Sequence, residues 1–213
     1  MQDTELYRYL LGLKRPWKVE RVKLDVINQR VDIWAYHTKG LRWACPECGT
    51  KMPLYDHGAE RTWRHLDSCQ FMTFLHARPP RVHCKNHGVR QVRLPWAEEK
   101  ARFTALFERL AIDVLRACDI LSASRILRIS WDEAWHIMER AVRRELKAKK
   151  KRHVQQIGVD ERTAGRGHDY VTVVNDPERA TVEHVEDGRK KESLDAYFVE
   201  LSRREREKIE AIA

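Results

Sequence analysis

Two four-residue segments of this 213-residue sequence have the spacing of paired metal ligands. They are Cys45-Pro46-Glu47-Cys48 and Cys84-Lys85-Asn86-His87. In each segment two residues separate the two ligating side chains, so a tight turn can direct both side chains at one ion. Together the segments offer four sulfur or nitrogen ligands, as tetrahedral Zn²⁺ requires, and leave no coordination position open. We therefore expect a structural zinc site rather than a catalytic one.

The alternative for Cys45 and Cys48 is a redox pair, or two unrelated core cysteines. A redox pair usually lies where a strand meets a helix in a βαβ unit. Pro46 and Gly49 instead predict a turn at this point, which favours the metal site.

The remaining cysteines and three of the histidines lack this spacing. Cys69 and Cys118 are predicted to be small core residues. His65, His76 and His83 could compete as ligands, but none is separated from a cysteine by two residues, as the paired ligands are.

Asp160 is the carboxylate that we most expect to take part in chemistry. It ends a stretch, residues 154–160, that is predicted to be a strand. Sites that transfer phosphoryl groups with two divalent ions use several carboxylates to hold Mg²⁺ or Mn²⁺. The alternative is an aspartate that only caps a turn, and spacing alone favours that alternative.

The segments that position the candidate zinc ligands are rich in predicted strands. Polar and apolar residues alternate over 21–26 and 31–36, and further strands are expected at 71–76 and 81–83. A short helix is expected over Asp3–Leu13. We predict a small β-rich zinc-binding domain over residues 1–98, whose limited core the metal would stabilise.

Residues 99–152 are predicted to form a three-helix helix-turn-helix domain. Apolar residues at helical spacing indicate a first helix over 103–118, and a short helix follows at 121–127. Ser130 is expected to cap a third helix, with Glu133 in capping-box position. The apolar face of that helix is predicted to consist of Trp131, Ala134, Trp135, Met138, Ala141, Val142 and Leu146. The alternative is an ordinary three-helix bundle, since helical hairpins are common.

The charge distribution favours an anionic partner. The net charge is +9, and residues 143–153 carry seven Lys or Arg side chains against one acid. We expect this arm to contact the phosphates of DNA, although it could simply be a solvated helix end and linker. The expected DNA-binding residues are Arg125, Arg128, His136, Arg140, Arg143, Arg144, Lys147, Lys149, Lys150, Lys151 and Arg152.

Residues 153–213 are predicted to begin another α/β domain. Strands over 154–160, 170–175 and 181–185 form an antiparallel meander. Helices are expected at 192–201 and from Ser202 to about Glu210, followed by the start of another strand. The whole chain is thus expected to be a multidomain α+β protein.

These features together resemble bacterial insertion-sequence transposases of the "ISL-three" family. The matching segments run in order along nearly the whole chain: Cys45–Gly49, Arg64–Asp67, Val82–Val89, Val92–Ala97, Ile129–Glu133 and Ile157–Glu161. The resemblance implies an N-terminal zinc finger, a helix-turn-helix and an RNase H-like domain with three catalytic acids (Asp-Asp-Glu).

The resemblance also implies roles for particular residues. It makes Cys45, Cys48, Cys84 and His87 the zinc ligands and the helix from Trp131 the DNA reader. It makes Asp160 the first acid of the triad and the first Mg²⁺ ligand. The second and third acids are missing from these 213 residues. We expect a truncated form, inactive by itself, and whether it is an enzyme is left open. Magnesium would act only in a full-length parent.

The expected function is binding of the terminal inverted repeats of an insertion sequence, which the parent would cut and join. The partner is double-stranded DNA, with a homodimer as a possible assembly, and the location is the cytoplasm, at the nucleoid. The alternative is a transcription regulator built from a zinc module and a helix-turn-helix. No apolar run is long enough to cross a membrane.

Overall fold

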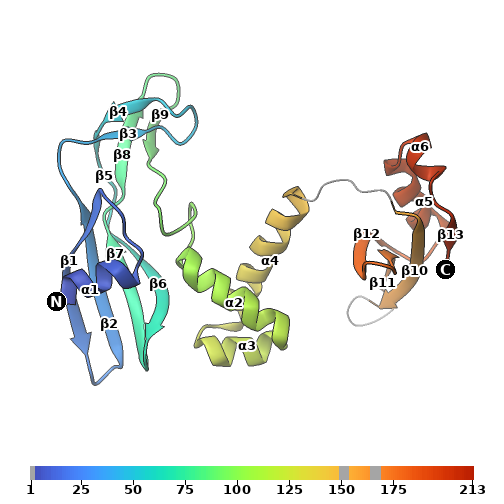
Figure 1. Ribbon diagram of the computed structural model, residues 1–213, viewed down its shortest axis with the longest axis horizontal. Helices are drawn as coiled ribbons and strands as arrows, with labels where there is room; N and C mark the ends of the chain where they lie inside the picture. Colours follow the sequence, from blue (N-terminus) through green and yellow to red (C-terminus); the bar gives the residue numbers. More distant parts are fainter. Residues whose placement is uncertain (1–2, 149–153, 164–168) are drawn as a thin grey trace. The chain divides into compact units, whose positions relative to one another are not determined.

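The computed structural model describes residues 3–148, 154–163 and 169–213. The chain forms two compact units, Met1–Lys147 and Ala148–Ala213. Strands dominate the first hundred residues, helices follow, and a second β-rich segment comes last (Figure 1). This mixture confirms the predicted α+β class. Among the described residues, no helix is both long enough and apolar enough to cross a membrane.

The first unit contains a four-stranded sheet in the order β1-β2-β7-β6. Its strands are β1 (Trp17–Asp25), β2 (Arg30–His37), β6 (Arg61–Ser68) and β7 (Phe71–Ala77). The two sequential pairs are antiparallel, and β2 runs parallel to β7 with Ile33 beside Leu75. Ile33 and Leu75 are fully buried, and for Ile33 the alternation of polar and apolar residues predicts this.

Two smaller sheets lie beyond one end of this sheet (Figure 1). One pairs β3 (Arg42–Ala44) with β4 (Lys51–Pro53). The other has the order β5-β8-β9, formed by β5 (Asp56–His57), β8 (Pro80–Cys84) and β9 (Gly88–Gln91). The turns next to β3 and β8 carry the predicted zinc ligands.

Tryptophans dominate the core of this β-rich part. Trp17, Trp43, Trp63 and Trp96 are all buried, and Trp17 and Trp96 meet edge to face at 4.5 Å. The helix α1 (Asp3–Leu10) ends earlier than predicted. Gly12, at φ +62°, turns the chain so that Leu11 and Leu13 enter the same core.

Three helices follow: α2 (Ala105–Ala117), α3 (Ile120–Leu127) and α4 (Trp131–Ala148). The side chains of Thr104 and Asp119 accept hydrogen bonds from backbone N–H groups at the starts of α2 and α3. Ser130 and Glu133 form the predicted capping box at the start of α4, with bonds of 3.0 and 3.1 Å. The core of the three helices consists of Phe103, Phe107, Ala111, Ala123, Leu127 and Ile137.

The predicted apolar face of α4 is wrong in part. The helix buries Ala134 and Ile137, of which only Ala134 was expected. Trp131, Trp135, Val142 and Leu146 are all exposed. The two tryptophans stack on each other, with ring centroids 5.5 Å apart. Packing of α4 against α2 and α3 therefore uses a face rotated from the one that the tryptophans suggest.

The helices pack against strand β6. The backbone of Arg64 exchanges hydrogen bonds of 2.9 Å with Arg102 and Thr104. The side chain of Thr104 lies 2.8 Å from Nδ1 of the buried His65, and Leu66 joins the helical core. The three helices and the sheet thus belong to one compact unit.

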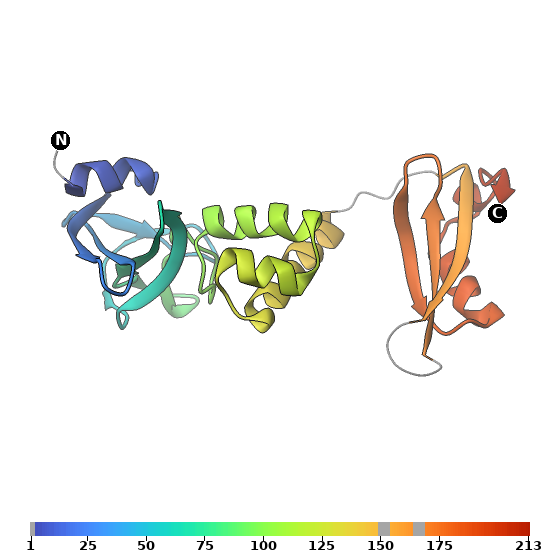
Figure 2. The same cartoon turned by 90° about the horizontal axis from the view of Figure 1, so that it is seen from below.

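The second unit is a sheet in the order β12-β11-β10-β13. Its strands are β10 (Gln156–Thr163), β11 (Tyr170–Asp176), β12 (Thr181–Asp187) and β13 (Ala211–Ile212). The first three form the predicted antiparallel meander, and β13 is parallel to β10. The helices α5 (Lys191–Glu200) and α6 (Arg203–Arg206) lie on one side of the sheet (Figure 2). The predicted second helix is shorter than expected, a single turn whose capping box is formed by Ser202 and Glu205.

Candidate metal centre and nucleic-acid interface

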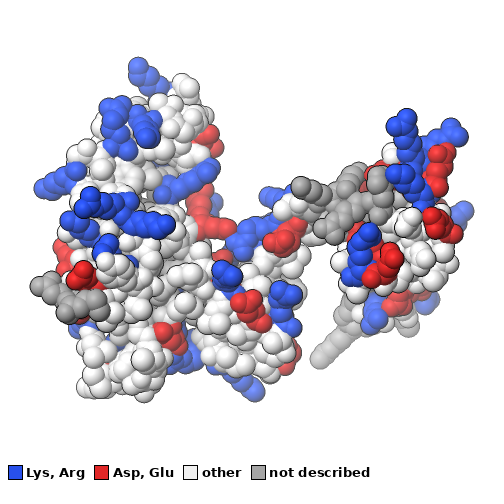
Figure 3. All heavy atoms as spheres, in the orientation of Figure 1, with Lys and Arg blue, Asp and Glu red and all other residues white. Residues whose placement is uncertain are grey.

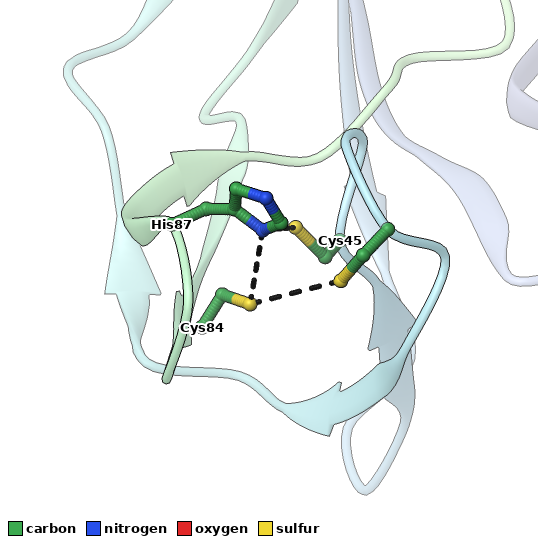
Figure 4. A group of neighbouring side chains, drawn as sticks. Cys45, Cys84 and His87 are labelled. Atoms are coloured by element: carbon green, nitrogen blue, oxygen red, sulfur yellow. Dashed lines mark hydrogen bonds between the residues drawn. The ribbon is translucent and has the colours of Figure 1, made fainter.

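The structure brings Cys45, Cys48, Cys84 and His87 together. One ligand atom from each lies within 4.8 Å of all the others. The Sγ atoms of Cys48 and Cys84 are 3.7 Å apart, and Nδ1 of His87 lies 3.4 Å from Cys84 Sγ and 3.8 Å from Cys45 Sγ. Figure 4 shows the side chains converging from the turn after β3, from the end of β8 and from the turn that follows β8.

These separations fit a tetrahedral zinc ion. Bond lengths of about 2.3 Å to sulfur and about 2.0–2.1 Å to nitrogen place two sulfurs about 3.8 Å apart and a sulfur and a nitrogen about 3.6 Å apart. The observed distances of 3.4 to 3.8 Å scatter around these values. All four positions are filled by protein, so a zinc ion here would have no site for substrate.

The electrostatics of the sulfurs also suit a cation. The hydroxyl and the backbone of Thr50 lower the pKa of the Cys48 thiol to about 6. The pKa of Cys84 is raised: the backbone of Asn86 favours its thiolate, but burial and the neighbouring sulfurs outweigh that effect. Three closely spaced sulfurs cannot all be ionised without a positive charge between them, and a bound Zn²⁺ supplies that charge.

Two glycines shape the turns that carry these ligands. Gly49 and Gly88 have φ values of +74° and +66°, in the left-handed region. Nothing lies within 4 Å of a Cβ atom built at either position, so backbone conformation rather than space requires glycine there. The N–H of Gly49 bonds the carbonyl of Cys45 at 2.9 Å, which closes the first turn.

The other histidines and cysteines considered as ligands have different surroundings. His65 contacts Thr104, His76 contacts Asp32 at 2.5 Å, and His83 packs against the ring of Tyr55. Cys69 is exposed and Cys118 is half-buried, so the prediction that both are core residues is wrong for Cys69.

The arginines predicted to contact DNA from α4 are paired with carboxylates. Arg140 lies 2.6 Å from the buried Glu108, and Arg144 lies 2.5 Å from Glu98. Arg143 pairs with Glu139 on the same helix at 2.7 Å. Glu98 and Glu108 were not singled out from the sequence, because only the fold brings them next to α4.

Arg128 occupies the turn between α3 and α4. It adopts the left-handed conformation that ends α3, with φ 55°. Its guanidinium donates to the carbonyl of Gln70 at 3.0 Å and pairs with Asp67. Asp67 lies near the end of β6 and Gln70 lies in the β6–β7 turn, so Arg128 ties the helix-turn-helix to the sheet.

The remaining predicted DNA-binding residues are exposed or undescribed. Arg125, His136 and Lys147 are exposed on α3 and α4. Lys149, Lys150, Lys151 and Arg152 lie outside the described residues. The DNA contacts of all these residues stay predictions.

Asp160 lies within β10, at the face of the sheet opposite α5. The prediction that it ends the strand is wrong, because pairing with β11 continues to Thr163. Asp160 pairs with Val173 of β11, whereas its neighbour Val159 pairs with the fully buried Val174. The carboxylate is about half exposed and lies 2.9 Å from Nε of Arg162. Among the described residues, Asp160 belongs to no group of three ligating side chains. The residues that the structure describes therefore do not form a two-metal site.

Comparisons with known families match three consecutive segments of the chain. Residues 41–87 match the zinc-finger of transposase IS204/IS1001/IS1096/IS1165. Residues 92–142 match the helix-turn-helix domain of transposase family ISL3, and residues 157–213 match the transposase domain of that family. The chain belongs to the ISL3 family of transposases. Its zinc-finger match contains all four clustered ligands, and its helix-turn-helix match contains α2, α3 and most of α4.

Curated relatives of this ISL3 chain are also transposases. The transposase for insertion sequence element IS1557 of Mycobacterium tuberculosis is 30% identical over 204 residues, covering 93% of this chain and 46% of the relative. The transposase for IS1001 of Bordetella parapertussis is 24% identical over 170 residues, covering 79% of this chain and 42% of the relative. The chain therefore spans less than half the length of these relatives. No solved structure matches it.

Proposed function

We propose that this chain is the DNA-recognition part of an ISL3 transposase together with the beginning of its catalytic domain. It binds the terminal inverted repeats of its element. The proposal depends on three features that follow one another along the chain in the order expected of the family. They are the four-ligand cluster, the capped helix α4 that follows the turn of the helix-turn-helix, and Asp160 in β10. The proposed domains cover residues 1–98, 99–152 and 153–213.

In this proposal α4 reads the DNA sequence. The N-terminal residues of a recognition helix meet base edges in the major groove, and on α4 the exposed polar side chains there are Asp132 and His136. Lys147, at the other end, is placed for phosphates. The zinc ion, held by Cys45, Cys48, Cys84 and His87, stabilises the turns around it and takes no part in chemistry.

The second unit is proposed to be the start of an RNase H-like domain. Three antiparallel strands, two helices and a strand parallel to the first have the element order expected of that fold. The N–H of Val159 bonds the carbonyl of Ala213 at 2.8 Å, so the end of β13 lies level with the residue before Asp160. A second carboxylate at this edge would lie beside Asp160. Magnesium chemistry belongs to a parent protein that supplies it.

The test is binding of the purified chain to duplexes from the ends of its own element and to scrambled duplexes of the same composition. We expect preference for the ends. His136→Ala should reduce that preference, whereas Lys147→Gln should weaken binding to both duplexes equally, because phosphate contacts carry no sequence information. Equal binding of the wild-type chain to both duplexes would reject the proposal.

A further inference from the structure

Cationic side chains surround the four-ligand cluster. The zinc-end surface, as we call it, consists of Arg42, Lys51, Lys85, Arg90 and Arg93, all of them exposed. Within residues 40–54 and 84–94, Glu47 is the one acidic residue. In the part of the chain that the structure describes, none of the five cations forms a salt bridge. Their charge is therefore available to a partner.

The fold brings these five residues together from two distant segments. Arg42 and Lys51 lie on the paired strands β3 and β4, and Lys85 lies between two of the clustered ligands. Guanidinium groups fix the arrangement further: Arg42 donates to the carbonyl of Lys51 at 2.9 Å, and Arg93 donates to the carbonyl of Pro46 at 2.7 Å. Figure 3 shows Lys and Arg gathered over the end of the unit where β3, β4 and β9 lie.

The cations of the zinc-end surface differ from the arginines of α4 in their ion pairing. Arg140, Arg143 and Arg144 already have carboxylate partners within 2.7 Å. Neutralising a phosphate with a cation that is already paired gains less than with an unpaired one, since the acid must be displaced. A Zn²⁺ ion with three thiolates and a neutral imidazole would add a net charge of about −1, which leaves the zinc-end surface cationic.

We propose that the zinc-end surface binds the phosphate backbone of DNA outside the bases read by α4. This inference rests on the proposed DNA-binding function. Because no helix lies in the surface and its cations are spread over turns and short strands, it should supply affinity rather than sequence preference. DNA is favoured over an acidic protein because the helix-turn-helix lies in the same compact unit.

The experiment uses the full chain and the variant K51Q/K85Q/R90Q. The matched control is K14Q/K18Q/K23Q, which removes three exposed cations from β1 and the segment before it. Dissociation constants are measured for an element-end duplex and a scrambled duplex between about 50 and about 200 mM salt.

The zinc-end variant should show a shallower salt dependence. Each lost phosphate contact lowers the slope of log K against log salt by about 0.9, so the slope should fall by roughly 2 to 3. Binding at physiological salt should weaken at least about 10-fold, equally for both duplexes. The control should match the wild type, and K51R/K85R/R90K should restore the slope because it retains the charge.

Two results separate this inference from the proposed function. Failure of the wild-type chain to prefer element ends rejects the function itself. Preference by the wild type with an unchanged slope in the zinc-end variant rejects the inference alone, and leaves these cations to an acidic protein partner. If the triple variant loses zinc, the single variants K51Q and K85Q replace it, each with an expected slope change of about 0.9.

Discussion

At the scale of single residues, the position of a cysteine in the fold decides whether it can bind the metal. Cys69 is also a reduced thiol, yet it is exposed at the β6–β7 turn and outside the cluster. Cys84 is buried at the end of β8 and faces two other ligands. The two cysteines therefore form a matched pair for testing the metal site.

Cys84→Ser should abolish zinc binding, and Cys69→Ser should leave it intact. The ligands lie at the ends of the short strands β3 and β8, which a bound metal would hold together, so the Cys84 variant should also melt at lower temperature. Zinc content by mass spectrometry and thermal melts with and without chelator check both effects. Equal zinc content in the two variants would contradict the assignment of Cys84.

Arg140 was predicted to contact DNA, but its ion pair with the buried Glu108 indicates a role in stabilising the fold. Its partner Glu108 is 5% exposed, so removing the guanidinium leaves a buried carboxylate with only Arg144, at 3.7 Å, to compensate. Arg140→Gln should cost about 2 kcal/mol of unfolding free energy. Arg143→Gln, which breaks an exposed pair within α4, should cost at most about 0.5 kcal/mol. Urea unfolding of both variants tests this, and similar losses would argue against a structural role for Arg140.

At the scale of elements, we expect the contact between β6 and α2 to depend on pH through His65. Burial, with a smaller contribution from Arg64, lowers the pKa of His65 from 6.5 to about 4. The unfolded chain therefore takes up a proton at this histidine first as the pH falls, and stability is lost between these two pKa values.

His65→Gln should flatten this pH dependence. From about pH 7 to pH 5, the wild type should lose about 2 kcal/mol more than the variant, because only the wild type must keep a buried imidazole neutral. Urea unfolding of both proteins at the two pH values measures the difference. Protonation of the metal ligands affects both proteins equally and therefore does not contribute to it. Parallel losses in the two proteins would exclude His65 as the cause.

Elements were predictable from sequence where local pattern decided them. The strands β1 and β2 follow alternation, β7 was expected as a further strand, and the caps of α4 and α6 follow from Ser130 and Ser202. Strand β6 was not predicted, because Arg64 and His65 look like surface residues. Both are buried and contact the start of α2, His65 through Thr104 and Arg64 through Phe107.

The same distinction holds for the candidate sites. The four ligands of the cluster were predictable because each pair is local, and two residues of spacing define a turn. The pairing of Arg140 with Glu108 joins residues 32 positions apart, and the exposure of Trp131 and Trp135 depends on how α4 rotates against its neighbours. No local pattern encodes either feature.

At the scale of the whole molecule, the contacts of Arg128 bear on how the two proposed DNA-binding surfaces must be spaced along the DNA. Arg128 ties the turn of the helix-turn-helix to the β6–β7 hairpin, and the proposed DNA contacts of α4 and of the zinc-end surface belong to one compact unit. Because one compact unit would make both contacts, the two DNA segments that they bind must face the protein at the same time. Inserting about 5 base pairs between the two contacted segments turns one contact away, whereas inserting about 10 restores its facing. Affinity should therefore rise and fall with the helical phase of the DNA, a periodicity that footprinting on spacer-length variants would record.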